Sequence, residues 1–160
     1  VIVVGDGKLG LLVAAVLRLT GADLLLIGRH RHKLAIAQSW GVATALGAEA
    51  MADRQADVVV ECSGHPASFA LARRLLRPAG TLVMKSTYHG QLEVDISALV
   101  VDEITVVGSR CGPFAPALRL LAAGLVDPTP LITACYSLAE GEAAFARAAE
   151  AGTLKVLLKP

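Results

Sequence analysis

A glycine-rich hexapeptide near the start of the sequence is the first group of residues that could do chemistry. The residues from Gly5 to Gly10 (GDGKLG) have the spacing GxGxxG, and they lie between the apolar run 1–4 and an apolar segment with helical periodicity. In a strand–turn–helix setting, Gly5 permits a tight turn, Gly7 lets the backbone approach a pyrophosphate, and Gly10 lets the helix pack closely on the strand. The free N–H groups and the positive dipole end of that helix face the phosphates. The motif predicts a dinucleotide site rather than a ligand-free turn, with candidate residues Gly5, Gly7, Lys8, Leu9 and Gly10.

The residues after the second apolar run, 24–27, indicate which dinucleotide is preferred. An NAD-preferring domain usually has Asp or Glu there to accept hydrogen bonds from the ribose, whereas this sequence has Gly28 followed by RHRHK. Gly28 leaves room for a 2′-phosphate, Arg29 can bind it with two hydrogen bonds, and His30 or Lys33 adds donors. This pattern favours NADP, with NAD possible; the other interpretation is a solvated basic helix start. The histidines lie two residues apart with no third ligand nearby, so they do not predict a metal site.

Three further strand ends carry candidate cofactor contacts. Ser63 and Gly64 allow close approach of the adenosine side, although simple turn formation explains this pair nearly as well. Lys85-Ser86 and Ser109-Arg110 end the next two strands, where the nicotinamide half would reach across the sheet. Cys62 fits a small core residue better than a nucleophile, because no base is identifiable beside it. The carboxylates are scattered, so the sequence predicts a cofactor site with no catalytic and no metal-binding residue.

The hydrophobic pattern predicts the elements that must position these residues. We expect strands at 1–4, 24–27, 42–46, 58–60, 81–84 and 104–107, and helices at 8–19, 32–40, 67–76 and 115–123. Strands separated by helices of about ten residues imply right-handed crossovers and an α/β fold with a doubly wound parallel sheet. Residues 1–110 are expected to form this Rossmann-type core. Residues 111–160 are expected to form a tail, with a helix at 139–151 between extended segments, that need not join the same sheet.

Composition agrees with one α/β domain and argues against several other classes. Of the 160 residues 54% are hydrophobic and 4% aromatic, a balance that suits a sheet covered by helices on both faces. The 15 Lys and Arg against 14 Asp and Glu give no basic field for nucleic acid. Three cysteines without zinc spacing indicate a reducing compartment, and neither a membrane span nor a signal peptide is apparent. We expect a soluble, cytoplasmic protein, and sequence missing upstream of Val1, which begins inside a strand.

Several segments together resemble the zinc-type medium-chain alcohol dehydrogenase superfamily over nearly the whole chain. They are the glycine loop, KLAIAQSWG at 33–41, DVVVECSG at 57–64, LRPAGTL at 76–82, EITVVGSRCG at 103–112, the segment 130–138, and GTLKVLL at 152–158. The resemblance implies hydride transfer between NADP(H) or NAD(H) and an alcohol or carbonyl substrate. It also implies nicotinamide contacts near Lys85-Ser86 and at Ser109, Arg110 and Cys111. It further implies that Lys155 pairs with the pyrophosphate and that two copies form a dimer through the strand edge 104–108.

The resemblance also implies a second domain. Members of the superfamily carry an N-terminal GroES-like domain with the catalytic zinc ligands and proton relay, and their tail from about Cys111 packs on it. We therefore expect this chain to bind cofactor without turning over substrate, with zinc, if any, held in that other domain. Two alternatives remain: a zinc-free quinone or enoyl reductase, and a non-catalytic nucleotide-sensing Rossmann module. Sensing modules usually keep an acid where this chain has Gly28.

Overall fold

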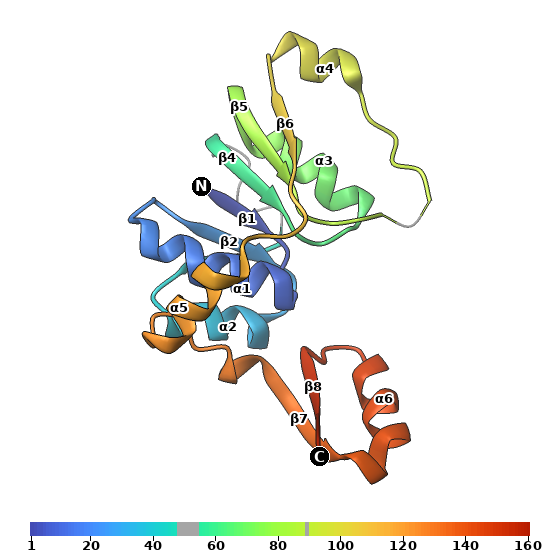
Figure 1. Ribbon diagram of the computed structural model, residues 1–160. Coiled ribbons are helices and arrows are strands. Elements are labelled where there is room, and N and C mark those ends of the chain that lie inside the picture. Colours follow the sequence, from blue (N-terminus) through green and yellow to red (C-terminus); the bar gives the residue numbers. More distant parts are fainter. Residues whose placement is uncertain (48–54, 89) are drawn as a thin grey trace. The chain divides into compact units, whose positions relative to one another are not determined.

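Two separate sheets organise the chain in the computed structural model, which describes residues 1–47, 55–88 and 90–160 (Figure 1). The larger sheet belongs to the unit Val1–Phe114 and the smaller one to the unit Ala115–Pro160. No helix among the described residues combines the length and the apolar character needed to cross a membrane.

The larger sheet is parallel throughout and has the strand order β3-β2-β1-β4-β5-β6. Its strands are β1 (Ile2–Val4), β2 (Leu25–Gly28), β3 (Ala43–Leu46), β4 (Ala56–Glu61), β5 (Leu76–Met84) and β6 (Thr105–Gly108). The order reverses between β1 and β4, which is the switch point where open α/β sheets bind their ligands. The predicted doubly wound α/β fold is therefore confirmed.

Helices connect these strands. They are α1 (Lys8–Leu17), extended by the 3₁₀ turn η1 (Arg18–Thr20), then α2 (Arg31–Ser39), α3 (Pro66–Leu75) and α4 (Ile96–Val101). Helix α5 (Phe114–Ala122) follows β6 and belongs to the smaller unit from Ala115 onward. Helices α1 and α2 contact each other and lie against β1, β2 and β3, whereas α3 lies against β1, β4 and β5. Because crossovers of this kind are right-handed, the reversal of strand order places these two groups on opposite faces of the sheet.

The core lies where the central strands meet these helices. Every residue of β1 and β2 is buried, as expected for strands covered on both faces. The main buried cluster joins strand residues such as Ile2, Val59 and Leu82 to Phe69 and Leu75 of α3. A rigid apolar centre of this kind fixes the carboxyl ends of β1, β2 and β4, where the polar residues of interest begin.

Two features of the segment after α3 differ from the sequence prediction. The strand expected at 81–84 begins at Leu76, because Pro78 ends the helical pattern while its fixed φ still suits an extended chain. Helix α4 was not predicted at all. Its N-cap Asp95 accepts a hydrogen bond from the N–H of Ala98 (3.1 Å), and its residues are not buried, so it has little of the amphipathic periodicity that a sequence pattern detects.

The smaller unit forms a sheet of its own. Strands β7 (Ile132–Ser137) and β8 (Lys155–Lys159) pair in parallel, with α6 (Gly141–Ala149) connecting them. Short 3₁₀ turns, η3 (Thr129–Leu131) and η4 (Leu138–Glu140), precede β7 and α6. Among the described residues, β7 and β8 pair only with each other, and the expected division of the chain near residue 110 stays a prediction.

Candidate functional site

A cavity of about 590 Å³ opens at the carboxyl ends of β1, β2 and β4 in the larger unit. Seven of its lining residues belong to the predicted site: Gly5, Gly7, Gly28, Arg29, His30, Lys33 and Ser63. Asp6, His65 and Arg74 also line it. The sheet reverses its strand order at this point, so topology and cavity indicate the same place for a ligand.

The glycine loop has the geometry that its motif requires. Gly5 has φ +119°, in a region that residues with a side chain rarely adopt. A Cβ at Gly10 would lie 1.8 Å from the carbonyl oxygen of Gly5, so only glycine lets α1 approach this closely. A Cβ at Gly7 would meet no heavy atom within 4 Å. The loop is therefore tight on the protein side and open at Gly7, on the side of the cavity.

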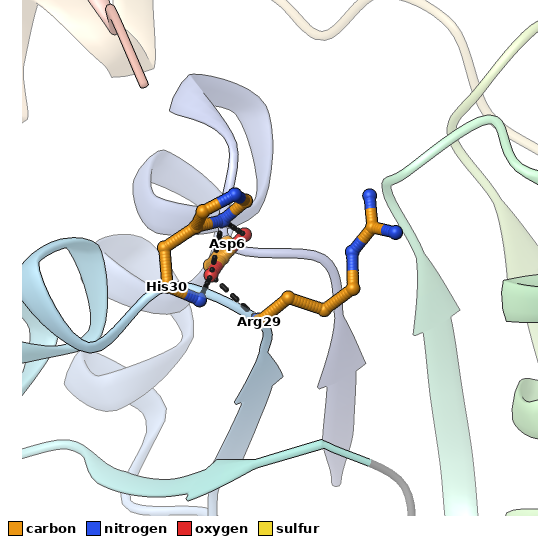
Figure 2. A network of polar contacts seen from close by, with 3 residues as sticks. All are labelled: Asp6, Arg29 and His30. Atoms are coloured by element: carbon orange, nitrogen blue, oxygen red, sulfur yellow. Dashed lines mark hydrogen bonds and ion pairs between the residues drawn. The ribbon is translucent and has the colours of Figure 1, made fainter. Parts of the chain in front are cut away.

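Asp6 holds the turn between β2 and α2 (Figure 2). Its Oδ2 accepts hydrogen bonds from the backbone N–H groups of Arg29 (2.7 Å) and His30 (2.6 Å), and Nδ1 of His30 lies 3.1 Å from each carboxylate oxygen. Burial by itself would raise the pKa of Asp6, but the hydrogen bonds from His30 and Arg29 outweigh it and hold the pKa below its ordinary value. Asp6 is therefore a buried carboxylate fixed at the edge of the cavity.

Gly28 is glycine for a reason that the sequence did not reveal. A Cβ at Gly28 would lie 2.4 Å from Cβ of Asp6 and 2.5 Å from its Oδ2. The space beside Gly28, which we expected to be open for a phosphate, is filled by Asp6. That part of the prediction is wrong, while the role of Gly28 in cofactor binding stays a prediction.

The charged residues of the cavity are mostly basic. Arg29, Lys33 and Arg74 line it, and Asp6 is the one acid among the described lining residues. Lys33 is only 7% exposed, yet neither it nor Arg29 has a side-chain ion pair within the part of the chain that the structure describes. Figure 2 shows the Arg29 side chain extending away from Asp6. Cations kept without a protein partner in this way suit an anionic ligand.

A second buried carboxylate, Glu61, connects the end of β4 to the segment after β5. Its Oε1 accepts hydrogen bonds from Ser63 Oγ (2.6 Å) and from the N–H groups of Ser63 (2.7 Å) and Gly64 (3.2 Å). Its Oε2 accepts one from the hydroxyl of Tyr88 (2.7 Å). Burial, together with the bond to Glu61, raises the pKa of Tyr88. Burial and the nearby Glu61 raise the pKa of Cys62 to about 12, which agrees with the prediction of a core residue.

The remaining predicted residues form two groups. In the first, Lys85 Nζ donates to the carbonyl oxygen of Arg110 (2.8 Å) and lies 3.4 Å from Ser109 Oγ, so the ends of β5 and β6 do meet. Gly64 has φ +70°, and a Cβ there would lie 2.9 Å from the carbonyl oxygen of Thr87 and 3.5 Å from Cβ of Ser86.

None of the first group lines the cavity, and neither does the second group, one member of which belongs to the other unit. Lys8 and Leu9 are exposed at the start of α1, and Cys111 is an exposed free thiol. Lys155 is the first residue of β8 in the smaller unit, whose position relative to the cavity is not described. Its expected contact with a pyrophosphate stays a prediction.

Three residues of the site were missed at the sequence level. Asp6 lies at the second position of the GxGxxG motif, where the motif allows any residue type. His65 caps α3 by accepting a hydrogen bond at Nδ1 from the N–H of Ala67 (3.2 Å), followed by Pro66 in the first turn. The His65-Pro66 pair is a signal for a helix start, and Arg74 is a basic residue on the same helix. Together they could have indicated that α3 borders the site.

The described residues do not gather a metal centre. Across 1–47, 55–88 and 90–160, no three or more His, Cys, Asp or Glu side chains lie close enough together to hold a metal ion.

Comparison with known proteins agrees with this geometry. A family model described as Zinc-binding dehydrogenase matches residues 9–123. The "Probable D-xylulose reductase A" of Aspergillus clavatus is 31% identical over 177 aligned residues, which cover 99% of this chain and 49% of that protein. The sorbitol dehydrogenase of Halalkalibacterium halodurans is 28% identical, and the alignment covers 100% of this chain and 51% of that protein. The chain spans about half the length of the curated relatives that it matches.

This chain likewise corresponds to about half of the solved structures that it resembles. A protein of Sinorhizobium meliloti 1021 assigned to the zinc-binding dehydrogenases, bound to NADP, has a TM-score of 0.88 and 29% identity, covering 99% of this chain and 52% of that one. An alcohol dehydrogenase of Escherichia coli CFT073 in complex with NADH has a TM-score of 0.87 at 20% identity, with 99% and 52% covered, and that likeness concerns the fold alone. The structural relatives thus include complexes with both dinucleotides.

Proposed function

Since this chain belongs to the zinc-binding dehydrogenase family and corresponds to its NAD(P)-binding part, we propose that its cavity binds NADP(H) in preference to NAD(H). In the whole protein this part serves an oxidoreductase that moves hydride between the dinucleotide and an alcohol or carbonyl compound. Relatives of this chain include a sorbitol dehydrogenase and a D-xylulose reductase, which favours a polyol or a related sugar as the substrate class.

The observation that carries the cofactor preference is the pair of basic side chains at the end of β2. Lys33 is buried at the cavity wall, and Arg29 is directed away from the nearest carboxylate. A 2′-phosphate between them would receive charge-assisted hydrogen bonds from both, while the ribose hydroxyl of NAD would leave both without a partner. The open space at Gly7, beside the N-terminus of α1, suits the pyrophosphate.

The chain's own residues bind and orient the cofactor in this proposal. When bound, the dinucleotide supplies hydride chemistry at its nicotinamide ring. The contacts of Lys85 with Ser109 and Arg110 fix the ends of β5 and β6, which would border that ring. The described residues do not bring together a group that could hold a zinc ion, so any zinc of the whole protein would be held by residues outside this set.

Two further expectations belong to the same proposal. The edge strand β6 would join a second copy of the chain into a homodimer, since all four of its residues are exposed. A reducing compartment such as the cytoplasm suits a chain whose three cysteines are all free.

Titration of this chain with NADPH and with NADH, followed by nicotinamide fluorescence, tests the proposal. We expect NADPH to bind more tightly. Arg29→Ala should weaken NADPH binding on the order of tenfold or more, because a charge-assisted hydrogen bond is lost, and leave NADH nearly unchanged. Arg31→Ala is the matched control, since Arg31 is an exposed neighbour that does not line the cavity.

Each outcome has a clear meaning. Tighter binding of NADH would overturn the preference while keeping the dinucleotide site. An equal loss of both cofactors in Arg29→Ala would show that Arg29 does not meet the 2′-phosphate. Binding of neither dinucleotide would overturn the proposed site.

A further inference from the structure

Asp6 occupies the place of an acid that the sequence otherwise lacks. Dinucleotide-binding domains that take NAD usually have an acid at the end of the second strand, whose carboxylate accepts hydrogen bonds from the ribose. Here that position is Gly28, and the Asp6 carboxylate lies directly beside it. The end of β2 therefore has a carboxylate after all, but one that comes from the glycine loop.

The two positions exclude each other sterically. A Cβ at residue 28 would lie 2.4 Å from Cβ of Asp6, an atom too close to the backbone to move away. Gly28 does not have a positive φ, so its own backbone conformation does not require glycine. The side chain of Asp6 is thus what excludes a larger residue at position 28.

The turn between β2 and α2, which is expected to contact the ribose of the dinucleotide, stabilises the Asp6 carboxylate as an anion. Its Oδ2 accepts from two backbone N–H groups, those of Arg29 and His30, at the start of α2. A helix start of this kind would otherwise be an anion site, so the carboxylate uses donors that a phosphate could take. Oδ1 has the ring nitrogen of His30 at 3.1 Å and keeps acceptor capacity on a residue that lines the cavity.

The net effect on a ligand follows from charge. A 2′-phosphate bound by Arg29 and Lys33 would also meet the like charge of Asp6, whereas a 2′-hydroxyl could donate to Oδ1. We propose that Asp6 supplies, from the glycine loop, the acid otherwise found at the end of β2, and that it limits the preference for the phosphorylated dinucleotide. This inference rests on the proposed function and deepens it: Arg29 and Lys33 favour NADP, and Asp6 keeps NAD usable.

The first test compares cofactor ratios. In Asp6→Asn the amide oxygen can still accept from the turn, but the charge is gone. We expect NADPH to bind about tenfold more tightly relative to NADH than in the unchanged chain. Asp57→Asn is the control, because it removes the same charge from an exposed residue outside the cavity lining. If Asp6→Asn fails to fold, Asp6→Ser provides a smaller neutral acceptor for the same comparison.

The second test addresses the steric exclusion by thermal unfolding. Gly28→Ala should lower the midpoint, and Asp6→Gly/Gly28→Ala should be no less stable than Asp6→Gly alone, because the colliding Cβ has been removed. Asp6→Ala would not relieve the collision, since it keeps that atom.

The outcomes separate this inference from the proposed function. An unchanged NADPH to NADH ratio in both neutral variants, or additive losses in the double variant, would overturn the role of Asp6 while both dinucleotides still bind. Binding of neither dinucleotide by the unchanged chain would overturn the proposed function, and this inference with it.

Discussion

The cysteines provide a test of the site at the scale of single residues. Cys62 lies buried beside the glycine loop with its pKa raised to about 12 by burial and by Glu61, whereas Cys111 and Cys135 are exposed. Because the thiolate is the reactive form, Cys62 has almost none of it at pH 8. We expect a thiol reagent to label two cysteines rapidly in the native chain and the third only after denaturation. Peptide mapping checks which residue is protected.

Cofactor binding sharpens this expectation. A saturating dinucleotide should slow the labelling of Cys62 further, since Cys62 lines the cavity. Rapid native labelling of Cys62 would contradict the burial described here.

Residue by residue, the sequence predicts the parts of the site that rest on local geometry. The glycine loop is recognisable because the contacts that require glycine are local. A Cβ at Gly10 would collide with the carbonyl oxygen of Gly5, and Gly5 itself has a positive φ. Asp6 was not predicted, because its partners lie 23 and 24 residues away and only the packing of β1 beside β2 brings them together. Long-range polar contacts of this kind leave no periodic signal.

At the scale of elements, Glu61 links two strand ends. It joins the turn after β4 to Tyr88 beyond β5, so one fully buried carboxylate holds these two segments together. Among the described residues, the Tyr88 hydroxyl is the one donor to Oε2 with ordinary hydrogen-bond length, since the N–H of Gly64 lies 3.5 Å away.

Removing that donor should destabilise the chain. Tyr88→Phe leaves a buried carboxylate oxygen without its partner, at a cost of about 1–3 kcal/mol in the free energy of unfolding. Urea unfolding measures the loss. Tyr136→Phe is the control, because Tyr136 lies in the smaller unit and the structure gives its hydroxyl no hydrogen bond to a described residue. Equal stability of Tyr88→Phe and the unchanged chain would mean that the bond contributes nothing.

The elements themselves were largely predictable, for a physical reason. Central strands such as β1 and β2 are continuous apolar runs because both faces are covered. The helix expected at 8–19 is followed by Gly21, whose φ of +74° suits a glycine that ends a helical segment. The exposed helix α4 escaped prediction because it has no buried face to impose a periodicity. The extension of β5 back to Leu76 escaped prediction because residues 76–80 contain Pro78 and Gly80, which interrupt the apolar run that marks a strand.

At the scale of the whole molecule, the β6 edge of the larger sheet is apolar and unpaired among the described residues. Strand β6 pairs with β5 on one side only, and Val106 and Val107 are 48% and 41% exposed. Exposed apolar strands at a sheet edge are rarely left open, because their free N–H and C=O groups invite pairing with another chain. A second copy related by two-fold symmetry would place β6 beside its own equivalent and close both edges at once.

The proposed dimer can be tested with a matched pair of variants. Val107→Glu would bring two buried like charges close to the two-fold axis, so we expect this variant to be monomeric where the unchanged chain is dimeric. Val16→Glu is the control, because Val16 on α1 is likewise 41% exposed and lies away from the edge. Sedimentation equilibrium at several concentrations measures the mass. A monomeric unchanged chain would refute the β6 dimer for this chain, and a dimer that persists in Val107→Glu would require an interface elsewhere.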